Sequence, residues 1–366
     1  MRIKLRQAFD LQMGKTPARN RPDYWNGDHK WISIADIGNA GKFLTKTKES
    51  ITKAGIDGSG IKVVPQGTVI MSFKLSIGKT AITSEDMYTN EAIMAFIDNG
   101  KFAVDTDYLY HLCCGTNWTA GTNKAVMGLT LNKATLLEKE IPLPDINEQH
   151  EIATKLDKID AIIAERQQQL ELIDQAVKSR FIELFGDPET NPKGWTRQRL
   201  DQICENLDSR RVPITSTDRK AGNYPYYGAS GIVDYVKDYI FDEDILLISE
   251  DGANLVMRST PIAFSVSGKV WVNNHAHVVR FESKATQKYI EICFALTDIS
   301  GSITGTAQPK LNQAKLNAMM FCVPPIELQE QFATFVEQTD KSKLAVQKGL
   351  QELEILKKSL MQQYFG

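Results

Sequence analysis

Two stretches of the chain carry apolar residues at alternating steps of four and three, the spacing of one face of a long helix. They fall within residues 144–186 and 324–366, and this spacing is typical of the seam of a coiled coil. An apolar seam on a long exposed helix has to be covered by a partner. The predicted seam residues are Ile152, Leu156, Ile159, Ile163, Leu170, Ile173 and Val177 in the first helix, and Phe332, Val336, Val346, Leu350 and Leu353 in the second.

The two stretches belong to an internal repeat. Residues 131–186 align without a gap on residues 311–366, and 16 of the 56 positions are identical. Two equivalent helices in one chain usually pair about an approximate two-fold axis, which makes them antiparallel. The alternative is that each helix packs on its neighbouring domain or on another protein. Arg166, Lys343 and Lys357 fall on the seam and are expected to set the register of the pair.

Prolines and glycines mark the ends of both helices. Pro144 precedes the first helix and Pro324 the second, and proline does not occur inside a regular helix. A Phe-Gly pair closes each stretch, with Gly186 and Gly366 as natural C-caps. Forty helical residues span about 60 Å. Because the repeat also matches Arg2 with Arg197, we expect Met1 and Gly366 to lie within about 30 Å of each other.

The segments outside the helices show short alternating or apolar runs between clusters of Gly, Asn, Asp and Pro, which favours strands and turns. Residues 67–74 resemble 243–250, and residues 89–97 resemble 273–281. The chain is therefore predicted to be α+β, with two similar, diverged domains and pseudo-two-fold symmetry.

Composition indicates a soluble intracellular protein with more than one domain. The chain has 366 residues, 42% hydrophobic and 24% charged, and a net charge of -2. We expect a cytoplasmic protein, because it lacks a long apolar run or secretion signal and its five cysteines have no regular spacing. With this charge, DNA binding would need local basic patches or a partner.

Several motifs invite a catalytic interpretation that their surroundings do not support. "SIGKT" (76–80) lacks the earlier glycine of a phosphate-binding loop, because position 73 is phenylalanine. "PDYWNGDHK" (22–30) contains Pro-Asp followed by Asp-x-Lys, as nuclease motifs do, but the spacing between the two parts is too short. His275 and His277 are expected to be structural, since metal ligation would need further ligands. We predict no metal site and no catalytic residue, and the sequence has no methyltransferase signature.

Phrases along nearly the whole chain resemble the DNA-specificity subunit of type I restriction–modification enzymes. The first half carries "GKTPARNRPDYWNGDHKWISIADI" (14–37), "GKTAIT" (78–83) and "IPLPDINEQHEIATKLD" (141–157). The second half carries "NPKGWTRQRLDQI" (191–203), "YPYYGASGIVDYV" (224–236), "SGKVWVNNHAHVVRF" (267–281), "GTAQPKLN" (305–312) and "PPIELQEQFATFVEQ" (324–338). Each phrase is weak alone, but their order is specific.

The resemblance implies two target-recognition domains separated by two long antiparallel helices. Each domain would read one half of a bipartite DNA site, and the helices would set the spacing and dock two methyltransferase subunits. A motor-nuclease subunit would join for restriction, and adenosylmethionine, ATP and Mg would be bound by these partners, not by this chain. We assign the first recognition domain to residues 1–143, the first helix to 144–186, the second domain to 187–323 and the second helix to 324–366.

Two different recognition domains on a rigid spacer can address two major-groove segments about one helical turn apart, so the target should be asymmetric. Basic and aromatic residues in loop-like stretches are the candidates for contact with bases and phosphates. These candidates are Lys15, Arg19, Arg21, Lys74, Lys79, Arg210, Arg211, Arg219, Lys220, Tyr226, Tyr227, Arg258 and Lys269. For each of them, solvent exposure without a contact, or core packing for the tyrosines, is the alternative. A single-chain enzyme and a scaffold without a DNA role are the alternative functions.

Overall fold

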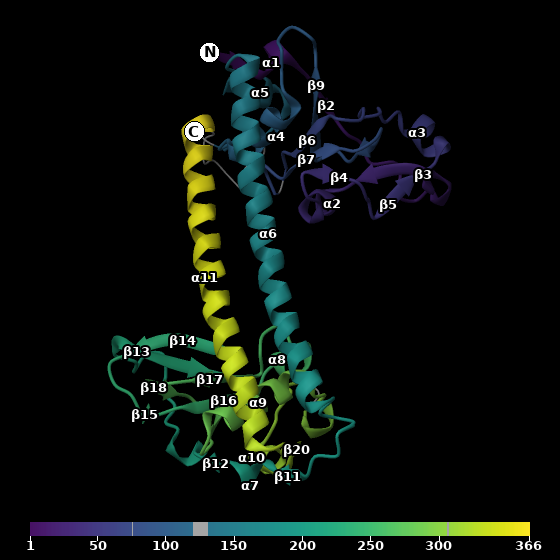
Figure 1. Cartoon of the computed structure of the whole chain (residues 1–366). Coiled ribbons are helices and arrows are strands. Elements are labelled where there is room, and N and C mark those ends of the chain that lie inside the picture. Colours follow the sequence, from purple (N-terminus) through teal and green to yellow (C-terminus); the bar gives the residue numbers. More distant parts are fainter. Residues whose placement is uncertain (75, 120–130, 306) are drawn as a thin grey trace. The chain divides into compact units, whose positions relative to one another are not determined.

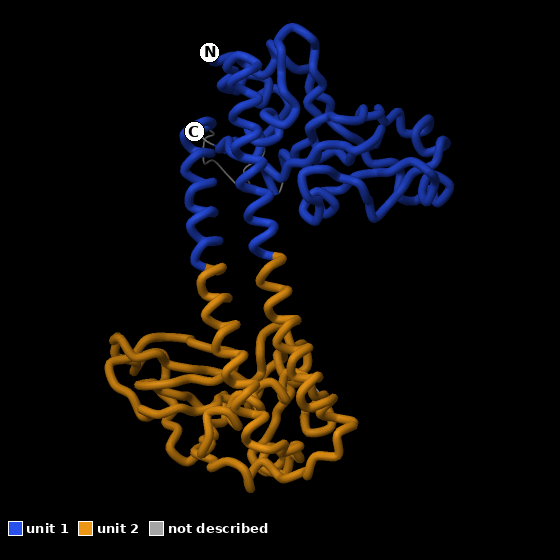
Figure 2. Tube along the Cα trace, in the orientation of Figure 1, with its two compact units in different colours: residues 1–167, 348–366 blue, residues 168–347 orange. Residues whose placement is uncertain are grey.

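The computed structural model describes residues 1–74, 76–119, 131–305 and 307–366, which leaves Thr306 of the "GTAQPKLN" phrase outside the described residues. The chain divides into two compact units (Figure 2). Unit 1 comprises residues 1–167 and 348–366, and unit 2 comprises residues 168–347. The two longest helices, α6 (Ile146–Phe185) and α11 (Ile326–Phe365), contribute to both units (Figure 1).

Unit 1 holds a large five-stranded sheet of order β2-β9-β6-β7-β4 and a small three-stranded sheet of order β5-β3-β8. The strands are β1 (Arg2–Lys4), β2 (Phe9–Met13), β3 (Trp25–Ile32), β4 (Phe43–Leu44), β5 (Glu49–Ile51), β6 (Val69–Ser72), β7 (Thr80–Thr83), β8 (Tyr88–Thr89), β9 (Ile93–Asp98) and β10 (Glu140–Pro142). The shorter helices are α1 (Leu5–Ala8), η1 (Pro22–Tyr24), α2 (Ile34–Asn39), α3 (Lys53–Ser59), α4 (Thr106–Gly115) and α5 (Lys133–Leu137).

Unit 2 holds a large four-stranded sheet of order β12-β19-β16-β17 and a small four-stranded sheet of order β14-β13-β18-β15. The strands are β11 (Arg197–Arg199), β12 (Glu205–Asn206), β13 (Ala221–Gly228), β14 (Gly231–Val236), β15 (Phe241–Asp242), β16 (Ile245–Ser249), β17 (Ala263–Val266), β18 (Lys269–Val272), β19 (Ala276–Arg280) and β20 (Met320–Cys322). The shorter helices are α7 (Leu200–Ile203), η2 (Asp208–Arg210), α8 (Asn254–Met257), α9 (Lys284–Leu296), η3 (Ser300–Ser302) and α10 (Gln313–Ala318).

The two units repeat one topology. In the large sheet of unit 1, β6 lies between β7 and β9 and is antiparallel to both. In the large sheet of unit 2, β16 lies between β17 and β19 in the same way. In the small sheet of unit 1, β3 pairs antiparallel with β5 and parallel with β8. In the small sheet of unit 2, β13 pairs antiparallel with β14 and parallel with β18. The sequence likenesses noted above fall on the equivalent strands β6 and β16, and β9 and β19. The predicted α+β fold with two similar domains is confirmed.

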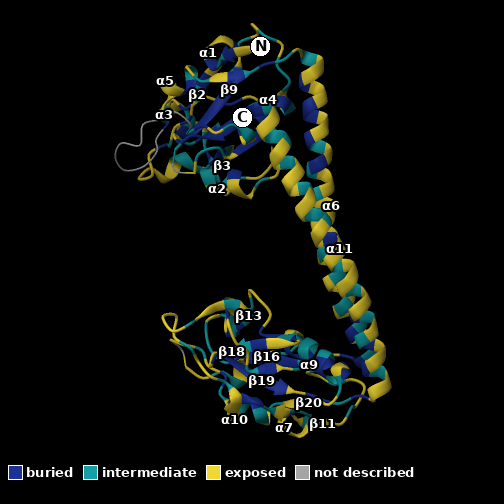
Figure 3. Cartoon of the chain, turned by 90° about the vertical axis from the view of Figure 1, so that its left-hand side faces the viewer, coloured by how far each residue is buried: buried dark blue, intermediate teal, exposed yellow. Residues whose placement is uncertain are grey.

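The central strands are apolar because both of their faces are covered. All residues of β6 and of β16 are buried, and β9 and β19 are buried along most of their length (Figure 3). One face of each large sheet packs against helices, and the other face packs against the elements on the side of the small sheet. Each large sheet therefore has an apolar cluster on both faces. Short continuous apolar runs are the pattern of such doubly covered strands.

Identical residues of the internal repeat hold equivalent structural positions. Asn132 caps α5 by accepting from the Thr135 N–H at 2.9 Å, and Asn312 caps α10 in the same way. Gln149 and Gln329 are buried near the start of the long helices, and each donates through Nε2 to the carbonyl of the preceding Pro144 or Pro324. The repeat is therefore conserved at the caps that define where its helices begin.

The long helices run antiparallel and are in contact within each unit. In unit 1, Lys357 forms an ion pair with Asp160, and Phe365 shares a buried cluster with Ile152. In unit 2, Lys343 forms an ion pair with Asp174, and Phe181 and Phe185 pack on Phe332. Residue numbers rise on one helix as they fall on the other, which confirms the predicted antiparallel coiled coil.

All twelve predicted seam residues are buried or partly buried. Ile152, Leu156, Ile159, Phe332, Val336 and Val346 are buried, and Ile163, Leu170, Ile173, Val177, Leu350 and Leu353 are partly buried. The lysines expected on the seam, Lys343 and Lys357, reach carboxylates of the partner helix. A charged group on the seam with its counter-charge opposite favours one register over its neighbours.

Both chain ends lie in unit 1 (Figure 2). The hydroxyl of Tyr108 donates to the carbonyl of Pro142, which pairs with Arg2, and its ring packs edge to face on Phe365. One buried tyrosine thus contacts elements next to both ends. The expected separation of at most about 30 Å between Met1 and Gly366 stays a prediction.

Candidate nucleic-acid interface

In unit 1 the predicted DNA-contacting residues of the 15–21 loop are partly engaged with the protein itself. Lys15 donates through Nζ to the carbonyl of Ser59. Arg19 pairs with Glu49, and Arg21 pairs with Asp23 at 2.7 Å. The Arg21–Asp23 pair is solvent-exposed, so Arg21 can exchange this partner for a ligand at small cost.

Lys74 and Lys79 lie on the connection between β6 and β7. In the described part of the chain neither amine has a carboxylate within ion-pair distance, and Lys74 Nζ lies 5.3 Å from the ring centre of Phe73. The Thr16 hydroxyl donates to Glu91 and lowers the pKa of that carboxyl, with Lys74 and Arg19 adding to the effect. This places Lys74 and the 15–21 loop close together as a cationic region.

In unit 2 three of the predicted arginines are occupied by structural contacts. Arg210 pairs with Glu243 and lies over the Phe241 ring. Arg211 is largely buried and joins Asp208 to Glu250. Arg258 donates to two backbone carbonyls at the end of α9. A DNA contact by any of these three would compete with contacts that stabilise the unit.

Lys220 and Lys269 are the unit 2 candidates whose amines form no ion pair within the described residues. Both side chains are exposed. Lys269 Nζ lies 4.8 Å from the ring centre of Tyr239, which in turn packs on Tyr224. Lysines beside exposed aromatic rings suit contact with phosphates and sugars.

The predicted tyrosines lie inside the unit. Tyr226 is 1% exposed, and its hydroxyl exchanges hydrogen bonds with the backbone of Ile214. Tyr227 is half-buried and packs on the cluster around Phe241. Their position fits the core-packing alternative that the sequence left open, and a DNA contact by Tyr227 stays a prediction.

Sequence reasoning missed the outer surface of β14. Ile232, Val233 and Tyr235 are each about half exposed on this edge strand, and Lys237 follows it. An edge strand with exposed apolar residues is unusual in a protein that acts alone. The only signal in the sequence was an apolar run next to a turn, which is equally typical of a buried strand.

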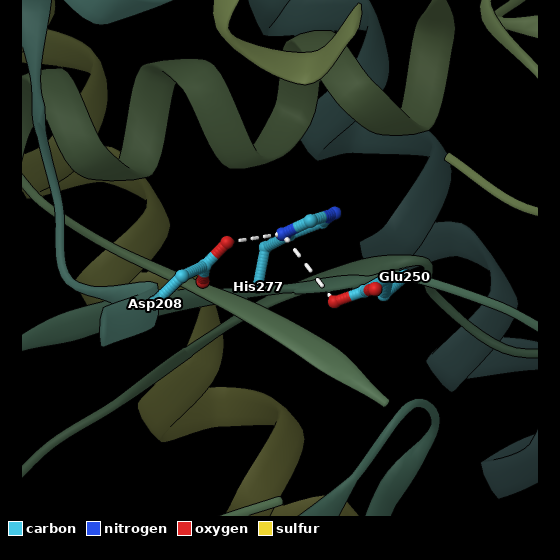
Figure 4. Close-up of side chains that lie close together, drawn as sticks. All are labelled: Asp208, Glu250 and His277. Carbon is cyan, nitrogen blue, oxygen red and sulfur yellow. Dashed lines mark hydrogen bonds and ion pairs between the residues drawn. The ribbon is translucent and has the colours of Figure 1, made fainter. Parts of the chain in front are cut away.

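Asp208, Glu250 and His277 form the one group of possible metal ligands among the described residues, with their ligand atoms within 4.8 Å of one another (Figure 4). The ring of His277 faces Asp208 through Nδ1 and the carbonyl of Leu311 through Nε2 at 2.7 Å. Arg211 and Lys310 pair with the carboxylates. The negative charge is already balanced by cations, which a metal ion would have to displace.

This network replaces apolar packing found in unit 1. His277 pairs with Ile248 on the helix side of its large sheet, whereas the equivalent pair of unit 1 is Met94 with Met71, and both of these lie in the apolar cluster. Burial raises the pKa of the Asp208 carboxyl, but the hydrogen bonds from His277 and the Val278 N–H and the charge of Arg211 together lower that pKa below its ordinary value. The cluster therefore fixes η2 to the large sheet, as expected for a structural histidine.

No helix within the described ranges is both long enough and apolar enough to span a membrane.

The chain matches the family model described as "Type I restriction modification DNA specificity domain" over residues 1–173 and 192–355. The two matched segments follow the internal repeat. The match covers most of the chain, which is enough to assign the chain to a family.

Curated relatives that align along most of their length are named as type I restriction enzyme specificity subunits. The chain is 24% identical to the type I restriction enzyme MjaIX specificity subunit of Methanocaldococcus jannaschii, over 98% of this chain and 90% of the relative. It is 25% identical to the EcoprrI specificity subunit of Escherichia coli, over 92% and 87%. The fold is similar to the crystal structure of a type I S subunit from M. genitalium, with a TM-score of 0.59, 16% identity and coverage of 100% and 96%.

Proposed function

Because the chain belongs to the type I restriction–modification DNA specificity family, we propose that it is the DNA-recognition subunit of such a system. The single observation that carries this proposal is the duplication of the family domain on two equivalent folds with different outer side chains. A subunit that reads DNA without acting on it needs a stable scaffold with polar and cationic loops.

Each unit reads one half of a split, asymmetric DNA site. In unit 1 the 15–21 loop is tied to the small sheet through Glu49 and Trp31, and in unit 2 Lys220 directly precedes β13 and Lys269 begins β18 of the small sheet. The small sheets share their topology but differ in outward residues: Lys30 of β3 pairs with Glu85 in unit 1, whereas β14 of unit 2 exposes Ile232, Val233 and Tyr235. Different surfaces on equivalent frames are suited to different base sequences.

The antiparallel helices α6 and α11 set the distance between the two half-sites. Two methyltransferase subunits dock on the repeated helical parts, and a motor-nuclease subunit joins them for restriction. Adenosylmethionine, ATP and Mg bind to these partners. The exposed Leu344, Ile355 and Leu356 of α11 offer apolar surface for such an assembly.

The test is co-expression of the chain with its methyltransferase partner, followed by methylome sequencing. We expect one methylated motif made of two different specified halves and an unspecified gap. The same chain without its partner should neither methylate nor cut DNA in the presence of Mg²⁺ and adenosylmethionine.

Exchange of residues 187–310 for the corresponding segment of another specificity subunit tests the modular reading. Only one half of the motif should change. A change in both halves contradicts independent reading, and the absence of any motif contradicts the DNA role and leaves the scaffold alternative.

A further inference from the structure

One arginine of each unit lies over the central strand of its small sheet. The Arg19 guanidinium carbon lies 3.9 Å from the ring centre of Trp25 and 5.0 Å from that of Trp31. The Arg219 guanidinium carbon lies 4.4 Å from the ring centre of Tyr226. A guanidinium over an aromatic face is held by its charge and by its flat shape together.

A carboxylate on the neighbouring strand holds each arginine in place. Arg19 makes a bidentate pair with Glu49, with Nη2 and Oε2 3.1 Å apart. Arg219 Nη1 lies 3.3 Å from Asp234 Oδ2. The hydrogen bond from Arg19 lowers the pKa of the Glu49 carboxyl, so the pair is ionised at neutral pH.

Strand register shows that the two arrangements are equivalent. On β5, Glu49 lies directly opposite Trp31 of β3, and on β14, Asp234 lies directly opposite Tyr226 of β13. On the other side, Trp31 pairs with Tyr88 of β8.

Tyr226 pairs with Trp271 of β18 in the same parallel arrangement. The same three partners thus occupy the same three places in two units whose sequences here have diverged. We call this arrangement the arginine clamp, formed by Arg19, Trp31 and Glu49 in unit 1 and by Arg219, Tyr226 and Asp234 in unit 2.

In unit 1 the clamp closes over the loop that leads from the large sheet to the small sheet. The indole of Trp31 donates to the carbonyl of Lys15 at 3.1 Å, and the indole of Trp25 donates to that of Ala18 at 3.2 Å. Arg19 directly follows the second anchor point and ties the loop to β5 through Glu49. The loop that carries Lys15 and Arg21 is therefore fixed at three places.

In unit 2 the equivalent loop is fixed in a similar way. The Trp271 indole donates to the carbonyl of Val212 at 2.6 Å, and the Ile214 N–H donates to the Tyr226 hydroxyl at 3.1 Å. Arg219 Nε also donates to the Ile214 carbonyl. Directly after Arg219 comes the exposed Lys220.

We propose that Arg19 and Arg219 are equivalent positioning residues, which hold the 15–21 and 212–220 loops in the conformation that binds DNA. This inference rests on the proposed function. A loop that is ordered before binding loses less conformational entropy in the complex, so the clamp raises affinity. The two units share the clamp although their other surface residues differ. The clamp therefore raises the affinity for DNA of any sequence, and the surrounding residues that differ between the units determine which bases are recognised.

The carboxylates provide a test in which two explanations predict opposite signs. If Arg19 and Arg219 act as simple surface cations, Glu49→Gln and Asp234→Asn remove a negative charge and should tighten DNA binding. If the arginines position their loops, the same substitutions free the loops and should weaken binding. We expect a loss of about three- to tenfold for each, the range that corresponds to ordering one or two side chains.

The measurement is the affinity of the full chain, in complex with its methyltransferase partner, for a duplex carrying the methylated motif and for a duplex without it. Arg19→Lys and Arg219→Lys keep the charge but lose the planar, bidentate contact, and both should weaken binding to the two duplexes alike. Arg199→Lys is the matched control, because Arg199 makes an exposed bidentate pair with Asp201 and, among the residues that the structure describes, has no aromatic ring beneath it. Thermal unfolding of each complex shows that binding is compared between folded proteins.

Unchanged or tighter binding by Glu49→Gln and Asp234→Asn overturns the proposal. A methylome in which an arginine variant relaxes one base of the motif also overturns it, because the residue would then read that base. Failure of the proposed function gives a different result, since the wild-type complex would then produce no motif at all.

Discussion

Arg258 places its charge against the protein backbone instead of toward solvent. Its backbone has a φ of +51°, and its guanidinium donates to the carbonyls of Phe294 at 2.7 Å and Thr297 at 2.9 Å. Burial lowers the pKa of this guanidinium. A cation at the last carbonyls of a helix stabilises the helix end, so Arg258 caps α9.

The structure therefore separates a structural arginine from a cation available to DNA. Arg258→Met should lower the free energy of unfolding by about 1–3 kcal/mol, because two carbonyls lose a charged donor. It should leave the salt dependence of DNA binding unchanged. Lys220→Met should leave the free energy of unfolding unchanged. If Lys220 contacts a phosphate, this variant should reduce the slope of log affinity against log salt concentration by about one. Denaturant unfolding and a salt titration of the complex measure both, and a reduced slope for Arg258→Met would contradict this assignment.

Asp208 makes stability depend on pH. Its pKa is lowered in the folded protein, so its stabilising contribution is fully present above the ordinary carboxyl pKa of about 3.9 and is lost as pH falls through the folded value. At pH 7, Asp208→Asn should cost about 3 kcal/mol, because it removes the charged acceptor of His277 and of the Val278 N–H and one of the two carboxylates that pair with Arg211. The difference from the wild type should shrink as the pH falls below 4. Urea unfolding at several pH values is the measurement.

Asp201→Asn is the control for Asp208→Asn. Asp201 is paired with an arginine on the surface, where solvent screens the interaction, so little change in stability is expected at either pH. An equally large loss in both variants would show that the Asp208 network is no more important than a surface pair.

At the scale of elements, α11 is held in unit 2 by an aromatic cluster. Phe332 is fully buried and packs edge to face on Phe181 and Phe185, which also contact Tyr289 of α9. Phe332→Ala should destabilise unit 2 by about 3–5 kcal/mol, since it removes a large side chain from a closed cluster. Ile355→Ala on the same helix should have almost no effect on stability, because that side chain is 69% exposed. Equal losses for the two variants would contradict the observed helix pairing.

The elements that were predictable from sequence are those determined by local pattern. The seam spacing predicted both long helices, and the repeat predicted their equivalence. Gln149 and Gln329 bond a proline carbonyl near the start of each long helix, and Asn132 and Asn312 cap the short helices α5 and α10 that precede them. Central strands such as β16 were visible as short apolar runs.

The state of each cation was not predictable, because it depends on partners far away in the chain. Arg19 meets a carboxylate 30 residues later, and Arg211 meets one 39 residues later. A basic residue in a loop gives the same signal whether it is paired, capping a helix or free. The arginine clamp was hidden for the same reason, since it becomes visible through strand register and not through sequence likeness.

At the scale of the whole molecule, unit 1 is assembled from two distant parts of the chain. Residues 348–366 complete a core formed by residues 1–167, and Phe365 is buried against Tyr108 and the start of α6. Unit 2 is one continuous segment.

Phe365→Ala should therefore weaken unit 1 and leave unit 2 intact. We expect faster amide hydrogen exchange in β2 and β9, because the cavity left by the ring costs about 3–5 kcal/mol, and unchanged exchange in β16 and β19. Mass spectrometry of peptides from the four strands makes the comparison within one sample. Faster exchange in all four strands would mean that the two units unfold as one.

The divided construction of unit 1 has a consequence for synthesis on the ribosome. Domains generally fold as their segments emerge, yet the first 167 residues lack the C-terminal part of their own core until all of residues 168–347 have been made. Unit 2, although encoded later, can be complete first. Until then the apolar surface of Tyr108 and α6 that Phe365 will cover stays exposed to solvent on the nascent chain.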